Sequence, residues 1–190
     1  MATIVLLIVL VVIVLWVISA YNGLIALKNQ VVNAWKQIDV QLKRRHDLIP
    51  NLVNTVKGAM EFERGTLEAV ISARNKAVTA SGVKQTAQAE GELTQALGRL
   101  FALTEAYPEL KANQNVLQLQ EELTSTENKV GFARQLYNDV ATQYNTRQAT
   151  FPTLLVAGLA KAQPAELWEI ENAAERAVPS VDLSLNKPAT

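Results

Sequence analysis

The amino-acid sequence predicts an all-α protein in which an N-terminal transmembrane helix is followed by an elongated antiparallel four-helix bundle. Three observations support this prediction. Residues 4–20 form an unbroken apolar run, apolar residues later in the chain recur at intervals of three and four, and proline or glycine separates the resulting stripes. The predicted boundaries are 1–22 for the transmembrane anchor, 23–180 for the helical bundle domain and 181–190 for a flexible C-terminal tail.

The apolar run at residues 4–20 is expected to cross a membrane. Of the first 20 residues, 18 are hydrophobic and none is charged. A helix of about 18 to 20 residues covers about 27 to 30 Å, which matches the hydrocarbon thickness of a bilayer. A cleaved signal peptide is the nearer alternative. It is disfavoured because no basic residue precedes Lys28 and because the run exceeds the usual length of an h-region.

The charges beside this segment predict its orientation. Its C-terminal flank carries Lys28 and Lys36 against Asp39, whereas its N-terminal flank carries only the α-amino group. Because basic residues favour the cytoplasmic side, we expect an inner-membrane protein with its N-terminus outside and its bundle in the cytoplasm. The alternative is a bundle in the periplasm.

The first two bundle helices are read from their apolar stripes. The first stripe continues from the membrane segment through Leu24, and Pro50 should end or kink that helix near Asp47 because proline disfavours the α conformation of the residue before it. A second helix is predicted over residues 50–80. Its inward positions are Leu52, Val53, Val56, Met60, Leu67, Val70, Ile71 and Val78.

The third and fourth helices are predicted over residues 85–107 and 116–151. The fourth has the clearest pattern, since one seam of positions, apolar except at Thr126 and Arg147, alternates steps of three and four over five heptads. The seam positions are Val116, Leu119, Leu123, Thr126, Val130, Ala133, Tyr137, Val140, Tyr144, Arg147 and Phe151. This seam is expected to face the other helices, and it becomes a surface for self-association only if they leave it uncovered. A shorter helical tail should follow Pro152.

Composition excludes several classes of site. The chain has no cysteine and one histidine, so thiol chemistry and multi-histidine metal sites are excluded. With 18 basic and 18 acidic residues, the net charge of zero argues against general nucleic-acid binding. We therefore expect no enzymatic activity, no catalytic residue, no metal and no cofactor. Partners should be the lipid bilayer, through residues 4–20, and other proteins, a second copy of the chain included.

The candidate interaction residues are Trp35 and three residues of a basic run at the end of the first stripe, Lys43, Arg44 and Arg45. The two arginines are expected to pair with a carboxylate on another helix, such as Glu121, Glu122 or Glu127, and contact with a partner protein is the alternative. Residues 21–44 span about 36 Å if helical, which is too far from a bilayer for these charges to sense it.

Other polar residues have weaker claims to function. His46 has the right chemistry for acid or base catalysis but no recognisable motif around it. The enzyme hypothesis requires His46 to lie in a concave site with carboxylates in hydrogen-bond reach. Six polar residues on otherwise apolar helices are expected to form a buried polar ladder: Arg74, Arg134, Tyr137, Asn138, Tyr144 and Asn145.

Several segments together resemble the LemA family of bacterial membrane proteins. The longest is residues 33–58, which read NAWKQIDVQLKRRHDLIPNLVNTVKG. Shorter matches follow in the family's order: Tyr21-Asn22, Ala73-Arg74-Asn75, Ala106 to Ala112, Leu117 to Glu127, Ala133-Arg134, Tyr137-Asn138, Tyr144-Asn145, Phe151-Pro152 and Ala177-Val178-Pro179. The resemblance implies a membrane anchor followed by an antiparallel helical bundle, and it brings no catalytic residues.

The resemblance also implies a function class. Members of the family are sometimes associated with a membrane zinc metalloprotease, and relatives occur among magnetosome proteins, which implies an envelope-associated scaffold or adaptor role. We therefore expect a non-enzymatic, membrane-anchored scaffold or adaptor of the bacterial cell envelope that acts through helix-mediated protein interactions. The alternatives are an accessory partner of a membrane metalloprotease in envelope quality control and an enzyme that uses His46.

Overall fold

The computed structural model describes residues 1–169 of the chain, and the predicted tail at 181–190 lies outside them. Within this part every regular element is helical, and no strand occurs. The elements are α1 (Ala2–Val56), the 3₁₀ turn η1 (Glu61–Glu63), α2 (Arg64–Thr79), α3 (Val83–Thr104), α4 (Pro108–Lys111), α5 (Gln114–Ala149) and α6 (Leu154–Ala157). The predicted all-α class is confirmed.

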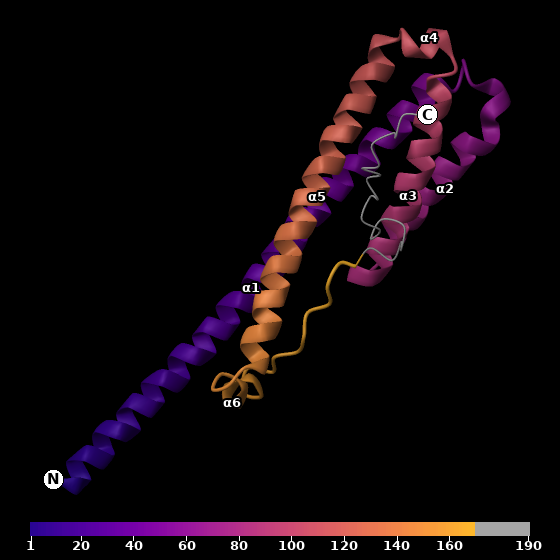
Figure 1. Ribbon diagram of the computed structural model, residues 1–190. Helices are drawn as coiled ribbons and strands as arrows, with labels where there is room; N and C mark the ends of the chain where they lie inside the picture. Colours follow the sequence, from indigo (N-terminus) through magenta and orange to yellow (C-terminus); the bar gives the residue numbers. More distant parts are fainter. Residues whose placement is uncertain (170–190) are drawn as a thin grey trace, which may run out of the picture.

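The four long helices run alternately up and down. Helix α1 leads away from the N-terminus, α2 returns, α3 runs parallel to α1, and α5 descends along α1 (Figure 1). The half of the molecule far from the N-terminus therefore contains all four long helices, and the nearer half contains two of them, α1 and α5, with the short α6 at its end. Residues 2–19 of α1 project beyond the bundle, and none of them is buried. This is the predicted elongated antiparallel bundle with an N-terminal anchor helix.

Helix α1 is continuous from Ala2 to Val56, so the prediction that it ends or kinks near Asp47 is wrong. Pro50 lies inside the helix, where it removes one backbone hydrogen bond, because residue 50 cannot donate to the carbonyl oxygen of His46. The guanidinium of Arg74 donates to that oxygen instead, through Nε at 3.2 Å. The lost bond is thereby replaced from α2, and the helix continues for a further turn and a half.

The second helix begins at Arg64 and not at Pro50. A turn at residues 57–60 and η1 separate it from α1, and this break resets the helical phase. The stripe predicted across the break consequently fails at its end, because Ile71 and Val78 are exposed whereas Ala73 and Ala77 are buried. The positions up to Val70 are buried as predicted.

The seam of α5 is covered by α1. Asn113 begins the helix by accepting hydrogen bonds from the backbone N–H groups of Asn115 and Val116, which is a regular N-cap. Most seam positions downstream are buried, and only its end, Arg147 and Phe151, is exposed. Since α1 already packs along the seam, it does not provide an open surface for self-association.

Two apolar clusters form the core. The distal cluster joins the end of α1 to α2, α3 and the start of α5, with Leu52, Leu93 and Leu100 at its centre. The proximal cluster joins α1 to the lower part of α5 and includes Leu24 and Ile38. The buried polar residues described below lie where these two clusters meet.

Up to residue 169, the chain after α5 is not the helical tail that we predicted. Among residues 150–169 only the four residues of α6 are helical, and residues 162–169 are extended. The rest of the predicted tail lies outside the described residues. The change of direction occurs at Lys161, whose φ of 46° lies in the left-handed region. The extended segment returns along α5 towards the start of α3 (Figure 1). We call residues 162–168 the strap.

Candidate functional site

A buried ionic cluster joins α1 to α3 and α5. Arg45 NH1 lies 2.7 Å from Glu90 Oε2, and His46 Nε2 lies 2.6 Å from Glu90 Oε1. A carboxylate oxygen accepts, so Nε2 of the imidazole donates. Arg45 NH2 donates to Thr94 Oγ1 at 2.8 Å and lies 2.6 Å from Glu127 Oε2. Both oxygens of Glu90 are therefore engaged by neighbouring residues of α1.

The cluster is almost closed to solvent. Arg45, His46 and Glu90 are 3%, 8% and 2% exposed. Because charges removed from water are costly unless paired, each member of such a cluster depends on the others. The arrangement fixes the register of α3 against α1.

A second group of side chains holds the strap against α5. Asn138 accepts from the backbone N–H of Trp168 at 2.8 Å and donates to its carbonyl oxygen at 3.0 Å. Asn145, two turns further along α5, makes the same pair of bonds with Ala165, both at 2.8 Å. The two asparagines therefore bind the strap through its backbone.

Aromatic side chains complete this contact. Trp168 is 4% exposed, its ring centroid lies 6.0 Å from that of Trp35, and the guanidinium carbon of Arg134 lies 5.5 Å above its ring. Trp35 also meets Tyr137 edge to face, at 5.5 Å between centroids. The Tyr137 hydroxyl donates to the Glu166 carbonyl at 2.7 Å. Burial, followed by the charge of Glu166, raises the pKa of Tyr137 above its ordinary value of 10.0.

An open apolar groove lies between α1 and α5 in the two-helix half. Val40 of α1 and Phe132 of α5 are 63% and 73% exposed, and Leu136 lies beside them. The charged residues that line the groove are Lys36 and Lys129, both basic. Gln41 also lines it, and its buried Oε1 accepts no hydrogen bond from the described residues.

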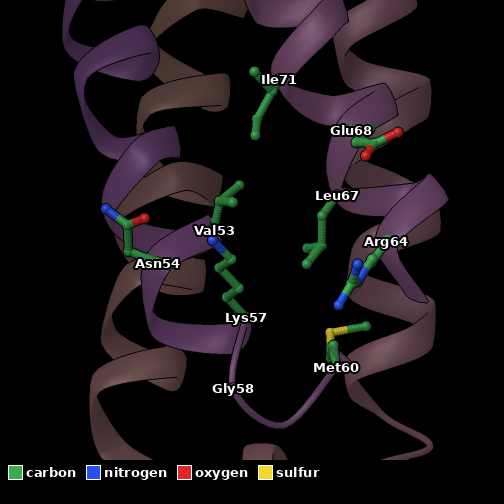
Figure 2. Close-up of a pocket in the computed structure, with 9 residues that line it drawn as sticks. All are labelled: Val53, Asn54, Lys57, Gly58, Met60, Arg64, Leu67, Glu68 and Ile71. Carbon is green, nitrogen blue, oxygen red and sulfur yellow. The ribbon is translucent and has the colours of Figure 1, made fainter. Parts of the chain in front are cut away.

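A larger hollow of about 810 Å³ lies at the far end, between the end of α1 and the start of α2. Its wall includes Val53, Met60 and Leu67, and Figure 2 shows Lys57 and Arg64 on opposite sides of its opening. Glu68 is the one acidic residue of the lining. The lining contains no histidine and no hydroxyl group, and Lys57 and Glu68 are the lining residues whose side chains are able to act as an acid or a base.

The four candidate interaction residues have different surroundings. Arg45 is buried in the ionic cluster and pairs with Glu127, one of the three expected carboxylates. Trp35 is half-buried in the aromatic contact with the strap. Lys43 and Arg44 are exposed. The structure therefore brings Trp35 and Arg45 into internal contacts and leaves Lys43 and Arg44 on the surface.

The buried polar ladder expected on the helices is present in part: five of its six residues make hydrogen bonds or ring contacts with other segments. Asn138, Asn145 and Tyr137 bind the strap, Arg134 stacks on Trp168, and Arg74 bonds to the carbonyl of His46. Glu90 was missed. Its position could have been noticed, because residues 86, 90, 93, 97 and 100 form one stripe and a carboxylate on an apolar face needs a partner.

His46 meets the stated condition for the enzyme hypothesis in part. It lies in the wall of a hollow between α1, α2 and α3, with the Glu90 carboxylate in hydrogen-bond reach. Among residues 1–169, no group of three or more histidine and acidic side chains is arranged to hold a metal ion. Glu90 is shared with Arg45, so the contact also serves to join helices.

The fold and these contacts define the class of protein: a helical-bundle protein whose N-terminal helix is long and apolar enough to cross a membrane. The model of the LemA family matches residues 34–183, and the chain belongs to the LemA family. It is similar to Protein LemA of Metamycoplasma hominis, with 30% identity over 138 residues, which is 72% of this chain and 63% of that protein. This chain therefore spans less than two thirds of the length of that relative. The family resemblance is confirmed.

Proposed function

We propose that the protein is a non-enzymatic, membrane-anchored scaffold or adaptor of the bacterial cell envelope. Residues 4–20 anchor it in the inner membrane, its N-terminus lies outside, and its bundle lies in the cytoplasm. Its partner is an amphipathic helix with acidic flanks, which packs into the groove between α1 and α5. The observation that supports this best is the groove, an apolar surface with a basic rim.

The membrane part of the proposal is supported by α1. Its residues 2–19 are unburied, and the most apolar window has a mean hydropathy of 3.2 with none of it covered by the rest of the chain. Surface apolar residues of this extent would be unfavourable in water. Lys28 and Lys36 follow the apolar run and support the cytoplasmic orientation of the bundle.

The choice of partner is supported by the shape and charge of the groove. Two antiparallel helices present a trough that a third helix can fill by packing its apolar stripe between them. Val40, Phe132 and Leu136 supply the apolar floor. Lys36 and Lys129 favour acidic residues beside that stripe.

The non-enzymatic part of the proposal is supported by the ionic cluster. A general base must lie where a substrate can reach it. The Glu90–His46 pair is buried, and the Glu90 carboxylate is also bound by Arg45. Reactive side chains are thus used for packing between helices, which favours a role carried out by surfaces.

Site-specific photo-cross-linking in native membranes tests the proposal. A photoreactive amino acid replaces Phe132 in the groove, and the matched control replaces Phe62, which is 95% exposed in η1. The expected product forms at position 132, and peptide mapping locates it on an amphipathic helix with acidic flanks. The double variant Lys36→Glu with Lys129→Glu should abolish it.

Three outcomes would overturn the proposed partner: no product above that of the Phe62 control, a product that is unaffected by the charge reversal, or a product mapping to a second copy of this chain. Orientation is tested separately. Single cysteines introduced at Lys43 or Arg44 should resist an impermeant maleimide in intact spheroplasts, and labelling there would place the bundle in the periplasm.

A further inference from the structure

The segment that follows α5 presents an unusual apolar surface at the end of the bundle nearest the N-terminus. We call residues 151–161 the foot. Phe151, Leu154, Leu155 and Leu159 are 78%, 54%, 67% and 71% exposed, whereas Val156, Ala157 and Ala160 are buried against the bundle. The foot is therefore apolar on both sides, and its outer side has no protein covering within the described residues.

The foot lies beside the part of α1 that leaves the apolar run. Helix α6 contacts both α1 and α5. Ala157 and Ala160 belong to the same apolar cluster as Leu24. On α1, Ala20 and Leu24 are the first buried residues after the uncovered segment, and Tyr21 between them is exposed. The packing of the foot thus begins where the apolar run stops.

Distance along α1 places this contact in the headgroup layer if residues 4–20 span the hydrocarbon. Leu24 lies about 6 Å beyond Ala20 along the helix axis. A bilayer has about 5 to 8 Å of headgroup region on each side of its hydrocarbon core. The exposed leucines of the foot would therefore meet lipid at the boundary between headgroups and acyl chains.

The charges around the foot have one sign. Residues 21–38 and 140–165, which make up this end of the bundle, contain Lys28, Lys36, Arg147 and Lys161 and no acidic residue. Lys28, Arg147 and Lys161 are all exposed. An apolar surface bordered by basic side chains is suited to the interface of a membrane that contains anionic lipids.

We infer that the foot is a second membrane contact, which inserts Phe151, Leu154, Leu155 and Leu159 into the interface of the bilayer crossed by α1 and binds anionic lipid headgroups through Arg147 and Lys161. The inference rests on the proposed membrane anchoring by residues 4–20. With α1, the foot gives the bundle two attachment points, which fix its rotation about the α1 axis.

The test uses fluorescence quenching in reconstituted vesicles. The full-length chain has no cysteine, so single cysteines can be introduced at Leu155 in the foot, at Leu10 in the anchor and at Phe132 in the groove, each labelled with nitrobenzoxadiazole. Phe132 is a matched control because it is 73% exposed, like Leu155 at 67%, but lies about 28 Å along α5 from Phe151. The quencher is a nitroxide-labelled lipid in phosphatidylcholine and phosphatidylglycerol vesicles.

The expected result is strong quenching of the labels at positions 10 and 155, several times greater than at position 132. Quenching at position 10 without quenching at position 155 would overturn the membrane contact of the foot and leave the anchoring by residues 4–20 intact. Absence of quenching at position 10 would overturn both the anchoring and the membrane contact of the foot. A label at position 155 that is shielded from water but insensitive to the lipid quencher would indicate a protein contact and would also overturn the inference.

Lipid charge is tested with the same label at position 155. Replacing phosphatidylglycerol by phosphatidylcholine should reduce its quenching severalfold, and the double variant Arg147→Gln with Lys161→Gln should lose this difference. The variant Arg99→Gln, exposed on α3 in the distal half, should retain it. Equal quenching in both lipids would contradict the recognition of anionic headgroups.

Discussion

Arg74 Nε on α2 donates a hydrogen bond of 3.2 Å to the carbonyl oxygen of His46 on α1. In an unbroken helix that carbonyl would accept from the N–H of residue 50, which is a proline here. Pro50 thus exposes a backbone acceptor on one face of α1, and α2 binds to it. A residue that usually ends helices serves instead as a point of attachment between two of them.

This relationship predicts that Arg74 and Pro50 are energetically coupled. Arg74→Ala should lower the free energy of unfolding by about 1 to 3 kcal/mol, because the His46 carbonyl is left without a partner. In a Pro50→Ala background the same change should cost less, because the new N–H bonds to that carbonyl. Denaturant unfolding of the four proteins in detergent, followed by circular dichroism, measures the coupling. An equal cost in both backgrounds would contradict it.

The buried ion pair between Arg45 and Glu90 should be far more sensitive than an exposed one. Glu90→Leu is expected to cost about 3 to 5 kcal/mol, because Arg45 and His46 stay buried and lose the buried carboxylate that they share, which leaves Arg45 with the partly exposed Glu127. The exposed pair of Lys76 and Glu92, at 3.0 Å, also joins two helices, and Glu92→Leu should cost about 0 to 1 kcal/mol. Unfolding curves for both variants compare the pairs directly, and similar losses would refute a structural role for the cluster.

The asparagines of α5 should control access to the strap. Asn138→Ala removes both bonds to Trp168, so trypsin should cleave after Lys161 faster and the strap should detach more often. Side-chain to backbone bonds contribute about 0.5 to 1.5 kcal/mol each, which predicts a change in cleavage rate of about one order of magnitude. Asn128→Ala, exposed on the same helix, is the control. Mass spectrometry of the digests identifies the cleavage site, and an unchanged cleavage rate would argue against a role of Asn138 in holding the strap against α5.

The raised pKa of Tyr137 predicts that the protein loses stability in alkaline solution. Because burial and Glu166 raise its pKa above 10.0, the unfolded chain loses this proton first as pH increases. The stabilisation from neutral Tyr137 is therefore complete below pH 10 and decreases as the pH rises through the pKa of the folded state. Tyr137→Phe should be less stable at neutral pH, by about 0.5 to 1.5 kcal/mol, but should lose stability less steeply above pH 10. Unfolding free energies across this range check both effects.

Glu166→Gln provides the companion measurement for Tyr137. It should reduce the rise in the pKa of Tyr137 without abolishing it, since burial is the larger cause. An ultraviolet absorbance titration that compares wild type, Glu166→Gln and Tyr137→Phe follows the tyrosine directly. A wild-type titration identical to that of Glu166→Gln would contradict the contribution of the carboxylate.

The fold was largely predictable because its main determinants are periodic. An uncharged apolar run and steps of three and four residues specify the anchor and the faces of the helices, and most of the predicted α5 seam is buried as expected. The errors occurred where one tertiary contact overrode a local rule. Pro50 suggested a helix end, but a side chain 24 positions later compensates for its missing donor.

The buried contacts were harder to predict because they join residues far apart in sequence. Arg45 and Glu90 are separated by 45 positions, and nothing local to either residue identifies the other. Likewise, nothing in the sequence around Asn138 and Asn145 on α5 identifies the strap as the segment that they bind. A sequence pattern can place them on one face, but only the return of the chain at Lys161 determines what they bind.

The continuity of α1 has a mechanical consequence. One helix without a joint extends from the apolar segment to Val56, so with residues 4–20 in a bilayer, as we propose, it would behave as a stiff lever with its pivot in the membrane. Residues 21–56 measure about 52 Å, and a change in tilt of about 10° would swing the far end sideways by about 9 Å. Changes in bilayer thickness alter helix tilt. With that anchoring, the distal tip of the molecule would convert a change within the membrane into a displacement deep in the adjacent compartment.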